Sequence, residues 1–221
     1  MSRSRRFVVA VLAVAVAVPF LAGGAGAQEE RPPAAEPAPH DQHGEHAAEP
    51  AMSPEMAAEM AAWEAASRPG PQHQALAAMA GEWDLDLTFW MEPGGEPQKT
   101  TATASRQMTF GGRFLEENVT GDMMGETFLG RAVLGYDNVT GKWWSTWIDN
   151  HTTGLMVGEG DWDPESNAGT FHYTATDPVS GEKRQVKGVT KIHSADHEVH
   201  EMWEERGGET FKSMEIVYRR K

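Results

Sequence analysis

Apolar and polar residues alternate with a period of two from Trp83 onward, and this alternation constrains the fold more than any other feature. In the first such segment, the apolar residues that share one face are Trp83, Leu85, Leu87, Phe89 and Met91. A period of two is typical of antiparallel strands that bury one face and expose the other. Because no helical stretch long enough for a parallel crossover follows, the pattern favours strands connected as an up-and-down meander.

Clusters of Gly, Pro, Asn and Asp recur at intervals of roughly 10 to 15 residues and divide this region into segments. They predict ten strands, at 82–91, 100–109, 113–120, 126–136, 142–149, 153–162, 169–176, 183–192, 197–205 and 210–220. Closure of such a sheet pairs the two strands that would otherwise be exposed edges. We therefore predict an all-β domain over residues 68–221, built as a roughly ten-stranded antiparallel up-and-down β-barrel and preceded by a short helical turn at 73–79.

The first 27 residues have the pattern of a secretory signal peptide. A basic segment, 2–6, precedes an apolar run over 7–21, and Ala25 and Ala27 offer a cleavage site before Gln28. Pro19 and the short apolar span argue against a transmembrane helix, so we expect no membrane span after cleavage. The sequence therefore predicts an exported protein, periplasmic or extracellular.

Two further segments precede the barrel. Residues 28–52 are rich in Pro, Ala, Glu and His, which predicts a disordered linker. Residues 53–67 predict an amphipathic helix that begins at Ser53 as the N-cap with Pro54 in the first turn. Met56, Met60 and Trp63 recur at helical spacing, and we expect this stripe to pack on the barrel or to cover an opening in it.

Composition excludes several kinds of function. The chain has no cysteine, which rules out disulfides, Cys-ligated zinc and a thiol nucleophile. Its formal net charge of −14 makes nucleic acid an unsuitable partner, because phosphate binding needs clustered Lys and Arg. Sequence motifs of serine hydrolases, phosphate loops and dinucleotide-binding folds are missing. An enzyme is therefore less favoured than a binding protein.

The tryptophan-rich segment around 143–150 is the most distinctive candidate for a binding site. Trp143, Trp147 and Asp149 share one face of a predicted strand, and Asn150 follows at its end. Aromatic area with a few polar groups suits a small-molecule pocket, although the same residues suit a tightly packed core. If the odd-numbered residues of the first strand face inward, Leu85, Leu87 and Phe89 line the same pocket.

The residues that lead into the first predicted strand resemble those of a known group of barrels. A short helix over 76–80 leads to Gly81-Glu82-Trp83, which resembles the opening of calycin barrels such as lipocalins. That resemblance implies that Trp83 closes the barrel base beneath a cation of the last strand, either Arg219 or Arg220.

A closer resemblance covers residues 68–221. Motifs in matching order resemble the uncharacterised bacterial family catalogued as domain of unknown function 1579, at Arg68–His73, Gly81–Trp83, Phe89–Gly94, Gly111–Leu115, Gly135–Asn138 and Thr146–Asn150. The resemblance implies a single β-barrel domain and brings no established reaction or catalytic residue.

Histidines offer weaker alternatives, and we expect no cofactor. His200 shares a face with Met202, and the likeness to calycin barrels implies that it could be an axial haem ligand, as in nitrobindin-like barrels. His193 and His197 flank a tight turn and could share a divalent metal with Asp196 or Glu198. The simpler interpretation is that all three are ordinary buried or exposed histidines.

Three functions follow from the sequence. The preferred one is an exported, lipocalin-like barrel that binds a small apolar or amphipathic ligand within or at the mouth of the barrel, at sites that include Trp147, His200 and Met202. The first alternative is a solidly packed barrel that acts as an envelope interaction module without a ligand. The second is a haem- or metal-dependent enzyme.

Overall fold

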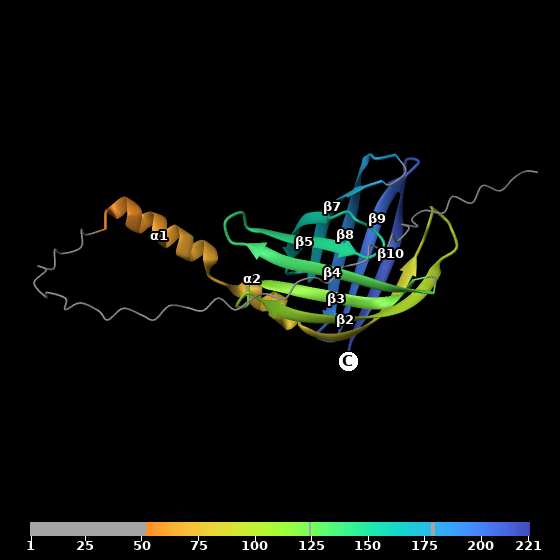
Figure 1. Cartoon of the computed structure of the whole chain (residues 1–221), viewed down its shortest axis with the longest axis horizontal. Helices are drawn as coiled ribbons and strands as arrows, with labels where there is room; N and C mark the ends of the chain where they lie inside the picture. Colours follow the sequence, from red (N-terminus) through yellow and green to blue (C-terminus); the bar gives the residue numbers. More distant parts are fainter. Residues whose placement is uncertain (1–51, 124, 178–179) are drawn as a thin grey trace, which may run out of the picture.

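The computed structural model describes residues 52–123, 125–177 and 180–221. The predicted signal peptide and almost all of the predicted linker lie outside these residues. Two helices, α1 (Pro54–Ser67) and α2 (Pro71–Ala78), precede ten strands (Figure 1). The strands are β1 (Gly81–Phe89), β2 (Gln98–Thr109), β3 (Phe114–Met123), β4 (Glu126–Asp137), β5 (Lys142–Asp149), β6 (Met156–Asp163), β7 (Ala168–Thr176), β8 (Lys183–Ser194), β9 (His197–Arg206) and β10 (Glu209–Arg220).

The strands form a closed barrel in which each strand pairs with its sequence neighbours and β1 pairs with β10. All pairs are antiparallel, and the closing pair sets Trp83 opposite Arg220 and Leu87 opposite Ile216. The predicted all-β meander is therefore confirmed, with strand ends that differ by a few residues. The sixth strand begins at Met156 rather than at 153, because residues 152–155 belong to the preceding loop.

The apolar face of β1 points into the barrel and anchors its main core. Trp83, Leu85 and Leu87 are buried with side chains from β2, β3 and β10. A second, smaller cluster comprises Phe171, Tyr173 and Val186 on β7 and β8. Burial of such side chains contributes about 1.5–3 kcal/mol each to folding. Between the two clusters the barrel interior is not completely filled.

Glycines on neighbouring strands leave room for two large inward rings. A Cβ atom at Gly188 would lie 2.6 Å from Cε2 of Tyr173, and one at Gly158 would overlap the same ring. A Cβ atom at Gly130 would likewise overlap the indole of Trp147. These positions therefore allow Tyr173 and Trp147 to lie flat against the sheet.

The two helices have different surroundings. α2 contacts β2, β3 and β4, and it buries His73 and Leu76. The His73 ring meets the Tyr136 ring edge to face, and its Nδ1 accepts from the backbone N–H of Gly70 at 3.0 Å. α2 therefore covers one end of the barrel, which we call the base.

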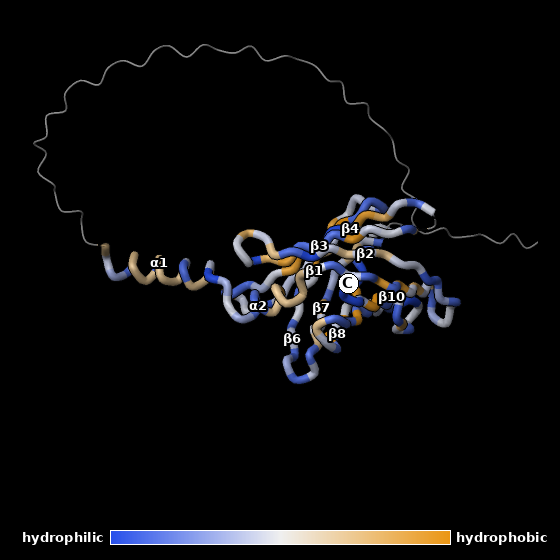
Figure 2. The backbone as a smooth tube through the Cα atoms, turned by 90° about the horizontal axis from the view of Figure 1, so that it is seen from below, coloured by the Kyte–Doolittle hydropathy of each residue, from blue (hydrophilic) through white to orange (hydrophobic). Residues whose placement is uncertain are grey.

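α1 extends away from the barrel, as Figures 1 and 2 show. Its described contacts with the barrel lie at its C-terminal end, where Nδ2 of Asn138 donates to the carbonyls of Ala66 (3.1 Å) and Arg68 (2.9 Å). The stripe of Met56, Met60 and Trp63 is exposed, with Trp63 at 71%. This differs from the expected packing on the barrel, because the extended backbone at Arg68 directs the helix outward. Within the described residues, no helix is long and apolar enough to cross a membrane.

Candidate functional site

A cavity of about 420 Å³ lies inside the barrel. This volume falls within the range of pockets that hold small molecules, about 300–1,000 Å³. Its walls are mainly apolar and come from strands all around the barrel. They include Leu85, Leu87, Phe89, Val119, Phe128, Leu134, Trp147, Met156, Phe171, Met202, Met214 and Ile216.

The structure places most of the sequence-predicted binding residues on this cavity. The residues that line it are Leu85, Leu87, Phe89, Trp147, Asp149, His200 and Met202. Trp143 and Asn150 are not among its lining residues. The ring of Trp143 packs against Tyr136 and Trp162. Asn150 bridges the backbone instead, because its amide donates to Thr127 and accepts from Leu129, both at 2.8 Å.

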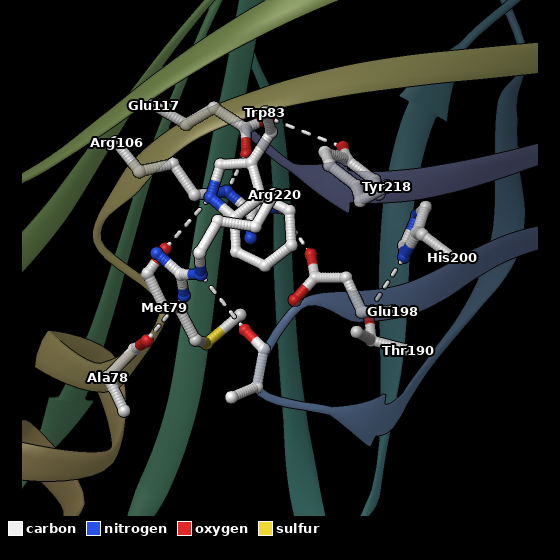
Figure 3. A network of polar contacts seen from close by, with 11 residues as sticks. Ala78, Met79, Trp83, Arg106, Glu117, Thr190, Glu198, His200, Tyr218 and Arg220 are labelled. Carbon is white, nitrogen blue, oxygen red and sulfur yellow. Dashed lines mark hydrogen bonds and ion pairs between the residues drawn. The ribbon is translucent and has the colours of Figure 1, made fainter.

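Arg220, rather than Arg219, closes the base over Trp83. Its guanidinium carbon lies 4.3 Å from the centre of the Trp83 ring, and the indole N–H donates to the carbonyl of Met79 at 3.1 Å. The same guanidinium donates to the carbonyls of Ala78 and Ala80, which ties the last strand to the end of α2 (Figure 3). Arg219 pairs with Asp86 on the outer surface, where both side chains are 58% exposed.

A buried ion network lies beside Trp83, at the base of the cavity (Figure 3). Arg106 on β2 pairs through Nε with Glu117 on β3, and its Nη2 lies 2.6 Å from Oε1 of Glu198 on β9. The three residues are between 2% and 7% exposed. The guanidinium also stacks on the Tyr218 ring at 4.4 Å and near Trp83 at 5.1 Å. One buried cation therefore holds two buried carboxylates together.

Two features of this network determine its chemistry. The hydroxyl of Tyr218 donates to Oε1 of Glu117 at 3.3 Å, and burial, together with that carboxylate, raises the pKa of Tyr218 well above its usual value. Nη1 of Arg106 is buried and has no hydrogen-bond partner among the described residues. The contact between Arg106 and Glu198 is a close ion pair whose Oε1 lacks an aligned hydrogen bond. The base thus presents one unused donor on Arg106, one unused acceptor on Glu198, and two carboxylates for one guanidinium.

His200 lines the cavity from β9, and its Nδ1 lies 2.8 Å from Oγ1 of Thr190. Burial lowers the pKa of His200 to about 4; Arg106 acts in the same direction, whereas Glu117 opposes it. The imidazole is therefore neutral at pH 7, as ligation of a metal requires. Its predicted role as an axial haem ligand stays a prediction.

The hairpin between β8 and β9 brings His193 and His197 together, with their ring centres 4.9 Å apart and their planes nearly parallel. Glu198 does not join them, because its side chain points into the barrel and pairs with Arg106. Within the described residues, three or more His, Asp or Glu side chains do not gather in an arrangement that could hold a metal ion.

The β-barrel domain matches the model of a known protein family. Residues 68–220 match the family model described as protein of unknown function DUF1579. The chain belongs to the DUF1579 family. This agrees with the resemblance in its sequence motifs, and it adds no activity. Among curated proteins, none matches the chain.

A solved structure shares the overall fold of this DUF1579 domain. The crystal structure of Rv2717c from M. tuberculosis matches with a TM-score of 0.53 and 13% identity, over 70% of this chain and 99% of that one. At this identity the likeness shows the fold alone. A redesigned β-barrel matches with a TM-score of 0.34 and 12% identity, over 66% of this chain and 95% of that one.

The buried ion network of Arg106 with Glu117 and Glu198 was not predicted from the sequence of this DUF1579 domain. Glu117 alternates with Leu115 and Val119, so it occupies an apolar face of β3, and Arg106 follows Ala104 in the same way on β2. A charge on an otherwise apolar face needs a buried partner. That signal was present in the sequence, but nothing local indicates which of the many acids and bases pair.

Proposed function

We propose that the barrel binds a small apolar or amphipathic molecule inside its cavity. The observation that carries this proposal is the cavity itself, about 420 Å³ between apolar side chains of a closed barrel. Protein interiors normally pack as densely as organic crystals and leave few voids larger than a water molecule. A continuous space of this size is therefore a feature to be explained, and a ligand explains it.

The chemistry of the lining supports an amphipathic ligand more than a purely apolar one. The side walls offer aromatic and aliphatic area, including Phe128 and Trp147, which stack on each other. The base adds Arg106, Glu117 and Glu198 in a buried setting. A ligand with an apolar body and one polar group matches both parts.

The packed-barrel interaction module is supported less well, since it requires a filled interior. The proposal also keeps the predicted export of the protein, for which the support is the sequence pattern of residues 1–27. We propose no catalytic step.

Native mass spectrometry of the mature protein, isolated from the compartment to which it is exported, tests the proposal. We expect additional mass in the native spectrum that disappears in a denaturing spectrum. Delipidated protein should regain such mass when it is mixed with small amphipathic molecules. If the delipidated barrel takes up none of a broad panel, the proposal is wrong and the packed module is favoured.

Haem binding is a second candidate because His200 places a half-buried, neutral imidazole on the cavity wall. Thr190 holds its Nδ1, which leaves Nε2 for an axial bond. A haem bound there would show a Soret band in purified protein, and His200→Ala would remove it. Reconstitution with haem that gives no such band would reject this candidate while leaving the first one in place.

A further inference from the structure

We propose that the ligand is an amphipathic cation, an ammonium group attached to an apolar chain or ring. This inference rests on the proposed function and narrows it to one class of molecule. It starts from the charged residues that line the cavity, which comprise five acids and two arginines. The acids are Asp122, Asp149, Glu117, Glu198 and Glu204, and the bases are Arg106 and Arg184.

The base of the cavity carries more negative than positive charge. Glu117 and Glu198 share the single guanidinium of Arg106, and all three are at least nine-tenths buried. An ion buried without full compensation is costly, because it has lost its hydration. One carboxylate is balanced by Arg106, so the other favours a positive group in the adjacent space.

The neighbouring bases do not supply that positive group. Arg220 lies on the Trp83 ring, and it is occupied by the backbone carbonyls of α2 and by Asp196, whose Oδ1 is 3.3 Å from its Nε. His200 is neutral at pH 7, since burial lowers its pKa to about 4. The excess negative charge therefore faces the cavity.

The opposite end of the cavity, which we call the mouth, has the same sign. Asp149 accepts hydrogen bonds from the Trp147 indole and from the backbone N–H groups of His151 and Thr152, all at 2.9 Å. These donors are neutral, so they hold the carboxylate without cancelling its charge. Arg184 is the cation at this end, and it is shared between Glu204 and Asp177.

A cavity with low-dielectric walls whose lining carries more negative than positive charge concentrates cations. The apolar chain or ring of such a ligand would contact Phe128, Trp147 and Phe171 along the cavity wall. A carboxylate group would instead bring a third negative charge toward Glu117 and Glu198. The unpaired Nη1 of Arg106 can donate a hydrogen bond to an acceptor on the ligand. A neutral alcohol could accept that bond without adding charge, so its affinity should lie between those of the ammonium and the carboxylate.

Three probes with the same chain and different head groups test the inference on the wild-type mature protein. Decylammonium, decanol and decanoate are titrated at pH 7 and equal ionic strength, with binding followed by calorimetry and tryptophan fluorescence. We expect decylammonium to bind at least about tenfold more tightly than decanoate, with decanol between them. If decanol or decanoate binds as tightly as decylammonium, the inference is overturned and the cavity still binds ligands. If none of the three binds, the proposed function fails as well.

Substitutions of the two buried glutamates test whether they cause the preference for decylammonium over decanoate. Glu117→Gln and Glu198→Gln each remove one buried charge and keep the side-chain shape, so each should reduce the preference for decylammonium over decanoate about tenfold. Glu116→Gln is the matched control, because Glu116 is adjacent on β3 and its nearest cation is Arg131 on the outer surface. An unchanged preference in a folded Gln variant overturns the inference. The wild-type comparison decides the question if neither variant folds.

Discussion

The two ends of the cavity are built in different ways. At the base, the contacts join residues far apart in the sequence, such as Tyr218 and Glu117, which are separated by 101 positions. At the mouth, the polar contacts of Asp149 reach residues two or three positions away. The base is also buried, whereas the ion pairs of Arg184 at the mouth are partly exposed. The base is therefore held by long-range contacts that close the barrel, whereas the polar contacts of Asp149 at the mouth are local to one strand end and its loop.

The largest expected effect comes from removing the cation of the base. Arg106→Met leaves Glu117 and Glu198 buried without their partner, and we expect a loss of about 3–5 kcal/mol in the free energy of unfolding. Urea denaturation measures it. Arg131→Met is the control, because the ion pair of Arg131 with Glu116 is exposed and should contribute less than about 1 kcal/mol. Equal effects of the two substitutions would contradict the structural role of the base.

Acid should destabilise the barrel through His200. The folded-state pKa of about 4 lies below the ordinary value of 6.5, so the unfolded chain binds a proton more readily between these pH values. Stability from this group is therefore present above pH 6.5 and is lost as the pH falls toward 4, by about 3 kcal/mol. We expect His200→Gln to flatten the pH dependence of unfolding in this window. His172→Gln is the control variant, because His172 is exposed on β7 and does not line the cavity.

Closure of the base over Trp83 is the next test. Arg220→Ala removes the stacking on the indole and the bonds to the end of α2, and we expect a loss of about 1–2 kcal/mol. Arg219→Ala removes an exposed pair with Asp86 and should cost less than about 1 kcal/mol. Thermal unfolding of the two neighbouring variants compares them directly. A larger loss of stability for Arg219→Ala than for Arg220→Ala would show that Arg219, and not Arg220, closes the base.

Substitution of a residue at the mouth should change ligand binding more than it changes the stability of the fold. We expect Trp147→Ala to weaken binding of the preferred probe about tenfold, or about 1.4 kcal/mol, with a smaller change in stability. Trp144→Ala is the control on the same strand, because its ring packs against Phe114 and Gly135 and does not line the cavity. A large loss of stability with unchanged binding would place Trp147 in the structural core.

Much of the cavity lining followed from the alternation of the strands. Inward-facing Leu85 and Leu87 on β1 and Met202 on β9 were predicted to line a pocket, and they line the cavity. Asn150 is not among the lining residues of the cavity: a residue at a strand end serves either a ligand or a turn, and the position of Thr127 and Leu129 shows that its amide bridges the backbone. The packing of α1 was misjudged, since helical spacing indicates a stripe but not the surface that it meets.

The sequence by itself determined the closed ten-stranded meander, because period-two alternation and turn residues act over short distances along the chain. The resemblance to calycin barrels further implied that Trp83 would face a cation of the last strand. Only the tertiary structure decided that this cation is Arg220, that Arg106 holds Glu117 and Glu198, and that a cavity remains between the two core clusters. The physical reason is that pairing and packing across a barrel depend on strand register and side-chain volume summed over all ten strands, which no local pattern encodes.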